Sequence, residues 1–419
     1  DRCAGSKYGH DKVIRAGYRQ MKLRQFLPLV LAALFAQDAI AADVEFLHPP
    51  AGKQTSLSRL TTDAGGKLYL SWVRSSGTRS SLYYASLASA EWSDATLIGA
   101  GEDWFVNWAD FPFLSVNDTG MAAHWLQKSS GGTYDYDVVA TFYRTATAQW
   151  SEPEIIHSDG VSAEHGFVSM LPMSNGRTFI SWLDGRYSGQ SKTHKGAHAS
   201  SGMTLRAGIF SGEGEKTAVW ELDDLVCDCC QTSSAMTGSG PVVVYRNRTT
   251  EEVRDTYITR LVGGQWSVPI AVHDDNWQID GCPVNGPAVS SGGELTVVAW
   301  FTAKNDYPKV SFVLSQDDGE TFGAPVIVAE ETTSGRISLT VLDSGGFAIS
   351  WLETLGASGT LKLARYDQQG EMIESLVIAE TKSSRRSGFP VITSHGDDVY
   401  VTWTDIQEKP QVRVARVRF

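Results

Sequence analysis

Leu70-Ser71-Trp72 ends a short apolar stretch, and tripeptides of the same kind recur after it at intervals of about 50 residues. The later copies are Ala123-His124-Trp125, Ile180-Ser181-Trp182, Val298-Ala299-Trp300, Ile349-Ser350-Trp351 and Val401-Thr402-Trp403, and Val243-Val244-Tyr245 fills the gap before the fourth Trp copy, with Tyr in the Trp position. Because a repeat of this period is typical of propeller blades, the copies predict a chain of seven similar units.

Each unit shows the pattern of four short antiparallel strands. In the second unit, Phe113-Leu114-Ser115 leads into Asn117-Asp118-Thr119-Gly120, whose residues tolerate the positive φ angles of tight hairpins. The Trp strand follows, then a longer loop, a third strand and a short turn into a fourth. This even spacing predicts an all-β protein, a β-propeller with seven four-stranded blades. Six blades, if one unit is miscounted, and a pair of β-sandwiches are the alternatives.

The two ends of the domain complement each other. Residues 391–419 supply only three strands of the last unit, whereas Val44-Glu45-Phe46-Leu47 is a spare apolar segment near the start. Docking this segment as the missing fourth strand would close the ring and leave no open sheet edge. We therefore expect a single domain over residues 42–419.

Composition and the first residues predict an exported protein. The 419-residue chain has a formal net charge of −12, which argues against a general nucleic-acid binder. Residues 21–41 read as a signal peptide, with a basic start, an apolar stretch over 26–36 and small residues at the cleavage site. That stretch is shorter than the about 20 residues a membrane span needs. We expect a periplasmic or secreted monomer without a membrane span in the mature chain, and interpret residues 1–20 as a non-native upstream extension.

One turn carries a motif. Ser315-Gln316-Asp317-Asp318-Gly319-Glu320-Thr321-Phe322 has Ser and Asp side chains that would hydrogen-bond the turn's own backbone, and a Gly that permits its geometry. The segment resembles the Asp box of the sialidase (neuraminidase) superfamily with BNR repeats, and the chain looks like a divergent member. The resemblance implies a structural role for Ser315, Asp317, Gly319, Thr321 and Phe322. It also implies a sialidase-type glycoside hydrolase that acts on acidic, sialic-acid-type glycans.

Long loops gather on one face of the predicted propeller. Strands alternate in direction, so the loops after the Trp strands share a face with the loops that enter each new unit, and function usually lies on such loops. A group of Arg residues from different units lies there, and guanidinium groups suit a carboxylate, which they can bind with two hydrogen bonds. The Arg residues that we expect to bind an acidic substrate are Arg186, Arg246, Arg248, Arg336 and Arg386.

The same face holds candidate catalytic groups. On the sialidase resemblance, Asp110, Glu252 and Asp255 are acid/base candidates, and Tyr187 is a nucleophile supported by Glu252. Aromatic rings that could stack on sugars, or pack between blades, are Trp104, Trp108 and Trp277. The alternatives are a non-catalytic propeller that binds a carbohydrate, peptide or metal, and a structural protein whose Arg residues tie neighbouring loops together.

Four Cys residues remain after the signal peptide: Cys227, Cys229, Cys230 and Cys282. An oxidising compartment and an even count predict two disulfides, one of which would join the first cluster to Cys282 in the next blade. The alternative is a copper(I) or zinc site in which two or three thiols are joined by an imidazole from His165, His194 or His273. We expect no other cofactor.

Overall fold

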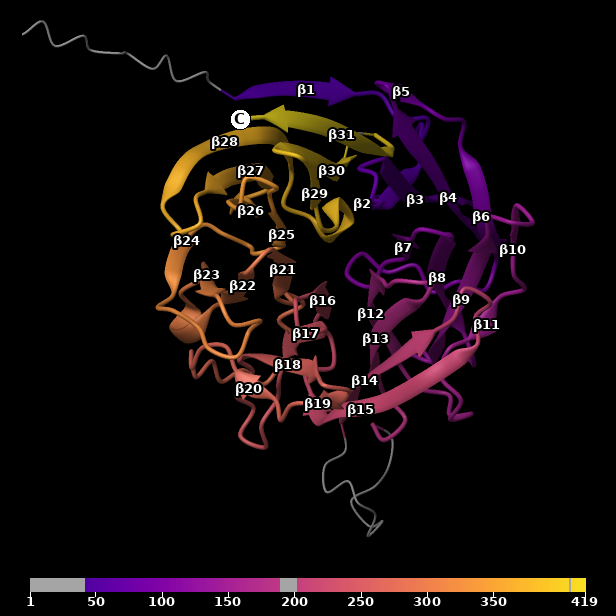
Figure 1. Cartoon of the computed structure of the whole chain (residues 1–419), viewed down its shortest axis with the longest axis horizontal. Helices are drawn as coiled ribbons and strands as arrows, with labels where there is room; N and C mark the ends of the chain where they lie inside the picture. Colours follow the sequence, from indigo (N-terminus) through magenta and orange to yellow (C-terminus); the bar gives the residue numbers. More distant parts are fainter. Residues whose placement is uncertain (1–41, 189–201, 407) are drawn as a thin grey trace, which may run out of the picture. The chain divides into compact units, whose positions relative to one another are not determined.

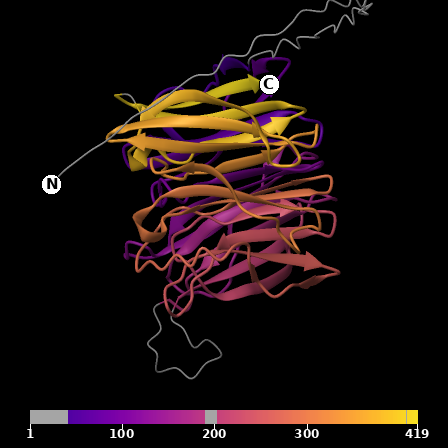
Figure 2. The same cartoon turned by 90° about the vertical axis from the view of Figure 1, so that its left-hand side faces the viewer.

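The computed structural model describes residues 42–188, 202–406 and 408–419, which belong to one compact unit. Seven antiparallel sheets surround a central axis in chain order (Figure 1). Viewed from the side, the sheets form the stacked blades of a propeller (Figure 2). The predicted seven-bladed fold is confirmed, and the six-bladed and sandwich alternatives are wrong. Among the described residues, no helix has the length and hydrophobicity of a membrane span.

The first four blades run outward from the axis, with extra short strands at some outer edges. Blade 1 contains β2 (Thr55–Thr62), β3 (Leu68–Ser76), β4 (Arg79–Ala88), β5 (Glu91–Trp92) and β6 (Thr96–Gly101). Blade 2 contains β7 (Phe113–Val116), β8 (Gly120–Lys128), β9 (Tyr136–Arg144), β10 (Gln149–Trp150) and β11 (Glu154–Ile155). Blade 3 contains β12 (His165–Pro172), β13 (Thr178–Asp184), β14 (Met203–Phe210) and β15 (Lys216–Val226). Blade 4 contains β16 (Ser233–Met236), β17 (Pro241–Arg246), β18 (Thr256–Val262), β19 (Gln265–Trp266) and β20 (Ile270–Ala271).

The last three blades have four strands each. Blade 5 contains β21 (Ala288–Gly292), β22 (Leu295–Thr302), β23 (Lys309–Ser315) and β24 (Val326–Glu330). Blade 6 contains β25 (Ser338–Val341), β26 (Phe347–Leu355), β27 (Ser358–Tyr366) and β28 (Met372–Lys382). Blade 7 contains β29 (Val391–His395), β30 (Asp398–Ile406), β31 (Pro410–Arg418) and β1 (Asp43–Leu47). Two 3-10 turns, η1 (Lys304–Asp306) and η2 (Arg385–Ser387), lie in loops.

The ring closes as the sequence predicts. β1 pairs antiparallel with β31, and Val44 lies opposite Val417 in this register. The indigo and yellow strands therefore lie side by side in Figure 1. Arg416 and Glu45 form an ion pair across the junction, with 2.6 Å between nitrogen and oxygen. The first and last segments of the domain thus share one sheet, which leaves no unpaired edge at the junction.

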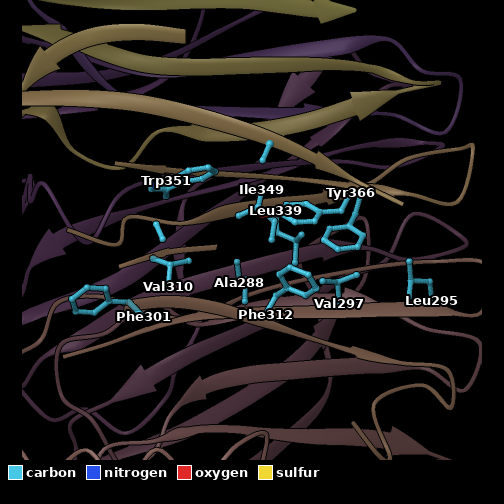
Figure 3. Close-up of a cluster of buried hydrophobic side chains, with 14 of the residues drawn as sticks. Ala288, Leu295, Val297, Phe301, Val310, Phe312, Leu339, Ile349, Trp351 and Tyr366 are labelled. Atoms are coloured by element: carbon cyan, nitrogen blue, oxygen red, sulfur yellow. The ribbon is translucent and has the colours of Figure 1, made fainter. Parts of the chain in front are cut away.

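The repeated aromatic residue lies in the second strand of each blade and packs in the core. Trp72, Trp182 and Trp300 are at most 1% exposed. Apolar side chains also fill the spaces between blades, as Figure 3 shows for blades 5 and 6. There Phe347 and Tyr366 stack with ring centres 5.1 Å apart. Burial of large apolar side chains between adjacent blades is what holds the sheets together.

The turn between β23 and β24 has the hydrogen bonds that its sequence predicts. The Ser315 hydroxyl donates to Asp317 Oδ1 at 2.7 Å and accepts the Gly319 N–H at 2.8 Å. Asp317 Oδ1 also accepts the Thr321 N–H at 2.9 Å. Gly319 has a φ of +81°, in the region that favours glycine. The motif is therefore a self-bonded turn between the third and fourth strands of blade 5.

Candidate functional site

A cavity of about 330 Å³ lies on the propeller axis, enclosed by the innermost strands of all seven blades. Hydroxyl groups make up much of its polar lining. They come from several different blades and include Ser169, Ser234, Ser290, Ser338 and Thr340. Of the described residues that line the cavity, Arg59 is the only charged one. The axis is therefore a polar cavity with one positive charge.

Arg59 has unused hydrogen-bonding capacity. Its guanidinium lies over the ring of Phe113, 4.0 Å from the centroid, and 5.1 Å from that of Phe111. Its Nε has no hydrogen-bond partner, and within the described part of the chain no carboxylate forms an ion pair with it. Burial lowers the pKa of Arg59 to about 9, so the group is still positively charged at neutral pH. Arg59 is partly exposed, so its unpaired donors are available to a ligand that enters the cavity.

A bulge in β2 sets the direction of Arg59. The register with β3 shifts between Ser56 and Arg59, and Leu57 in this interval has a φ of +54°. A bulge adds a residue to one strand and re-aims the side chains that follow, and such strain in a non-glycine residue is concentrated at functional sites. Arg59 thus faces the cavity because the inner strand of blade 1 is locally irregular.

Two carboxyl groups share one phenol near the cavity. The Tyr136 hydroxyl lies 3.2 Å from Asp110 Oδ2 and 2.8 Å from Glu164 Oε1. Asp110 Oδ1 accepts the Phe167 N–H at 2.8 Å, at a second bulge, in β12. Asp110 also directly precedes Phe111, whose ring lies in the cavity wall. We call Asp110, Tyr136 and Glu164 the carboxyl–tyrosine triad.

Burial gives both carboxyl groups of this triad unusual proton affinity. It raises the pKa of Asp110 to about 8 and the pKa of Glu164 to about 7. Asp110 is 2% exposed, whereas Glu164 is partly exposed. A carboxyl group that keeps its proton near neutral pH can act as a general acid. Glu164 is the more exposed of the two carboxyl groups.

A His–Asp cluster lies beside the triad and consists of Asp137, His157, Asp159, His165 and Asp184. The two imidazole rings stack with centres 3.7 Å apart, and Asp159 Oδ2 lies 3.1 Å from a nitrogen of each. Burial and the charge of His165 lower the pKa of His157 to about 4, so His157 is neutral. Hydrogen bonds from Arg186 and His165 outweigh burial and hold the pKa of Asp184 well below its usual range. The cluster is a buried ionic network at the loops of blades 2 and 3.

Arg186 and Arg248 are both held by carboxylates. Arg186 forms two hydrogen bonds of 2.7 Å with Asp184 and reaches Asp159 at 3.1 Å. Arg248 pairs with Glu252 at 2.6 Å and with Asp228 at 2.9 Å, and the charge of Asp228 acts on Glu164. Both guanidinium groups are partly exposed but already paired with carboxylates. Neither guanidinium is therefore a free cation.

The predicted arginine clamp does not gather at one point. Arg246 is 2% exposed and donates to the carbonyl groups of Asn285, Arg254 and Phe301 at 2.7 to 3.1 Å. Arg336 donates to the carbonyl groups of Ser384 and Gly388 and is 7% exposed. Arg386 is exposed in η2. Their donors therefore link blades or face solvent, and the cation inside the cavity is Arg59.

The other predicted catalytic residues occupy different surroundings. Asp255 is 5% exposed, and its two oxygens accept the N–H groups of Asn276 and Trp277. Arg248 and Arg254 lower the pKa of Glu252, so this side chain is an ionised partner of two arginines. Tyr187 is partly exposed next to Arg186.

The three predicted aromatic platforms differ in accessibility. Trp104 is 9% exposed and stacks on Trp125, with centres 5.0 Å apart. Trp277 is 5% exposed and lies under the guanidinium of Arg246. Trp108 is partly exposed and stacks on Phe389, which lines the axial cavity. Trp108 alone is therefore placed near the cavity with an accessible ring.

The predicted disulfides are not formed. The Sγ atom of Cys227 lies 3.3 Å from that of Cys230 and 3.9 Å from that of Cys229, beyond the about 2.05 Å of a disulfide. Cys282 is exposed, whereas Cys227 and Cys230 are buried, so the expected link between blades 4 and 5 is absent. Among the histidines proposed to join these thiols, His165 lies in the His–Asp cluster and His273 pairs with Asp275. His194 and His198 lie outside the described residues.

Sequence reasoning missed Arg59, Tyr136, Glu164 and His157 as site residues. Arg59 is the only charged residue in a strand that otherwise consists of Ser, Leu and Thr. A lone Arg in an inner strand could have indicated a site residue. Glu164 lies in the loop that enters blade 3, directly before β12, yet its partner Tyr136 belongs to blade 2. Contacts between blades of this kind cannot be read from the spacing within one unit.

Comparisons with known proteins identify the fold. No protein-family model matches the chain, and no curated protein is similar to it in sequence. An ulvan lyase of a polysaccharide lyase family is similar in structure with a TM-score of 0.55 at 12% identity, over 88% of this chain and 94% of the lyase. The phage phi92 endosialidase has a TM-score of 0.51 at 8% identity, over 90% of this chain and 69% of the endosialidase. A protein of unknown function from Dyadobacter fermentans has a TM-score of 0.50 at 11% identity, over 90% and 98% of the two chains.

These neighbours share a propeller fold with the chain at very low sequence identity. The propeller fold that the resemblance of the Ser315–Phe322 turn implies is therefore confirmed. Fold alone does not assign a reaction, which depends on the residues of the site.

Proposed function

We propose that this protein is a carbohydrate-active propeller that binds an acidic glycan, with the acidic group of a sugar held by Arg59 in the axial cavity. The observation that carries the proposal is the unpaired guanidinium of Arg59 in a cavity whose other described lining residues are uncharged. A carboxylate or sulfate would satisfy its donors, and the serine and threonine hydroxyls would bind the hydroxyls of the sugar.

The fold neighbours support an acidic sugar as the ligand class. The ulvan lyase is described as bound to a polymer of GlcA and Rha3S, a uronic acid and a sulfated sugar. The phage phi92 protein is named an endosialidase, an enzyme for sialic acid polymers. Both names refer to an acidic glycan, but they describe different reactions. We therefore assign the ligand class from Arg59 and derive the chemistry from the neighbouring groups of this chain.

For the reaction we propose sialidase-type hydrolysis of a glycosidic bond, with Glu164 as the general acid. Glu164 is partly exposed and keeps its proton near neutral pH, so it can protonate the leaving oxygen. The Tyr136 hydroxyl hydrogen-bonds to Glu164 and to the buried Asp110, and these contacts hold Glu164 in place. Tyr187, partly exposed beside Arg186, is our candidate for the nucleophile. The predicted signal peptide leads us to propose that this reaction takes place in the periplasm or outside the cell.

The test is turnover of a fluorogenic sialoside, beside a reducing-end assay on uronic acid polymers, by wild type, Glu164→Gln and Glu154→Gln. Loss of one general acid should lower kcat by about 100-fold or more at nearly constant KM. Glu154 is exposed in β11 and serves as the matched control, with no expected change. In the wild type, kcat/KM should fall as the pH rises above about 7, because Glu164 must be protonated to act.

Two results would contradict this assignment. Full turnover by Glu164→Gln would remove Glu164 from the chemistry. No turnover by wild type on any acidic glycan, with binding that depends on Arg59, would favour the alternative of a non-catalytic carbohydrate-binding propeller.

A further inference from the structure

The loop that enters blade 4 brings three thiols together. The Sγ atoms of Cys227, Cys229 and Cys230 all lie within 4.8 Å of one another. Cys227 lies 3.3 Å from Cys230 and 3.9 Å from Cys229, measured between Sγ atoms. Adjacent residues such as Cys229 and Cys230 ordinarily point apart, so the loop is folded specifically to direct both side chains inward.

These separations match the ligand set of a single metal ion. Zinc–sulfur bonds are about 2.3 Å long, so two thiolates on a tetrahedral ion lie about 3.8 Å apart. The distances from Cys227 to its two partners lie on either side of this value. A disulfide would need about 2.05 Å and could join only two of the three sulfurs. The arrangement of all three is therefore better explained by one shared cation.

A positively charged neighbour supports thiolates at this position. The Arg254 Nη1 lies 3.3 Å from the Cys227 Sγ and can donate a hydrogen bond to it. Arg254 is itself held by Glu252 at 2.7 Å. Hydrogen bonds of this kind to the ligand atoms orient them and tune a metal site. Cys227 and Cys230 are at most 1% exposed, so the site is nearly closed to solvent.

We propose that Cys227, Cys229 and Cys230 bind one thiophilic d10 ion, zinc(II) or copper(I). Soft thiolates select these ions, and binding would release the protons of the three thiols. Three thiolates leave a net negative charge on either complex, which the guanidinium of Arg254 offsets. The grouped donors contain no described imidazole or carboxylate, so a water molecule would complete a zinc site, whereas copper(I) would need no fourth ligand.

The ion would stabilise the rim of the axial cavity. The residues that follow the thiols reach across three other blades. Gln231 donates to the Ala109 carbonyl at 2.6 Å and accepts the Gly286 N–H at 2.8 Å. The Thr232 hydroxyl donates to the Phe167 carbonyl at 2.8 Å. A metal that fixes residues 227–230 therefore holds in place the segment that connects blades 2, 3, 4 and 5 at the cavity.

The test measures bound metal in the full chain. Protein purified under reducing conditions is incubated with zinc(II), or anaerobically with copper(I), then desalted and analysed by mass spectrometry for metal content. Wild type and Cys282→Ser should keep one equivalent of one of the two ions, because Cys282 lies outside the group. Cys227→Ser and Cys230→Ser should lose at least nine-tenths of it. Sulfur X-ray absorption should report three metal–thiolate bonds.

A measurement on wild type alone guards against variants that fail to fold. Metal should slow alkylation of Cys227, Cys229 and Cys230 at least tenfold, a chelator should restore the rate, and Cys282 should react quickly in both states. Failure of wild type to retain either ion would overturn the proposal, whether these thiols are free or two of them are joined in a disulfide. Retention that is equal in Cys227→Ser and Cys282→Ser would overturn it as well.

Discussion

Arg246 and Arg59 carry the same guanidinium group but are used in opposite ways. Arg246 lies between blades 4 and 5, where the carbonyl groups of Asn285, Arg254 and Phe301 accept its hydrogen bonds. Arg59 lies on the axis, packs on two Phe rings and leaves its Nε without an acceptor. The first arginine holds two blades together, and the second has donors available to a ligand.

This contrast shows why arginine content alone does not locate a ligand site. Exposure separates them only in part, since Arg246 is 2% exposed and Arg59 is partly exposed. What separates them is whether the protein satisfies the donors, because a buried polar group without a partner costs free energy until a ligand supplies one. A hydrogen-bond donor that has no acceptor in the free protein is therefore a better guide to a ligand site than the number of arginines.

The largest effect that we expect comes from removing the satisfied arginine. Arg246→Met removes the donor of three carbonyl groups, two of which are buried, and should lower the free energy of unfolding by about 3 kcal/mol or more. Arg59→Met removes a charge that has no partner and should change that free energy by less than about 0.5 kcal/mol, or raise it. Urea denaturation of both variants measures the difference. Equal losses of unfolding free energy in the two variants would contradict the contrast between Arg246 and Arg59.

A separate effect, on the pH dependence of stability, should follow from the buried acid that has no counter-charge. Burial raises the pKa of Asp110 from 3.8 to about 8, so the native state binds a proton that the unfolded chain has lost between these pH values. Stability should therefore fall as the pH rises through this window and level off above it. Asp110→Asn keeps an acceptor for the Phe167 N–H and should flatten this fall. Denaturation at about pH 5 and about pH 8 tests the change, and an unchanged slope would contradict the assigned protonation.

The fold could be predicted because each blade repeats its own local signals. Trp72, Trp182 and Trp300 mark equivalent buried positions, and the short turns between strands carry residues that allow positive φ. The closing strand could be predicted from the missing fourth strand alone. These features depend on contacts within a blade or with the next one, so one sequence is enough to reveal them.

The site was predicted less well because it depends on contacts between blades and on irregular backbone. Arg59 faces the cavity because of a bulge in β2, which the sequence of this strand does not predict. Glu164 acquires its surroundings from Tyr136 of blade 2. Spacing could not distinguish Arg246, whose hydrogen bonds are made within the scaffold, from a free cation.

The central claim is that Arg59 binds the acidic group of a sugar, and calorimetric titration tests it most directly. Wild type, Arg59→Met and the exposed control Arg79→Met are titrated with sialic acid and with glucuronate, beside neutral glucose. We predict that wild type and Arg79→Met prefer an acidic sugar to glucose, and that Arg59→Met binds it about 10- to 100-fold more weakly. Equal affinity of wild type and Arg59→Met, with both folded, would contradict the account.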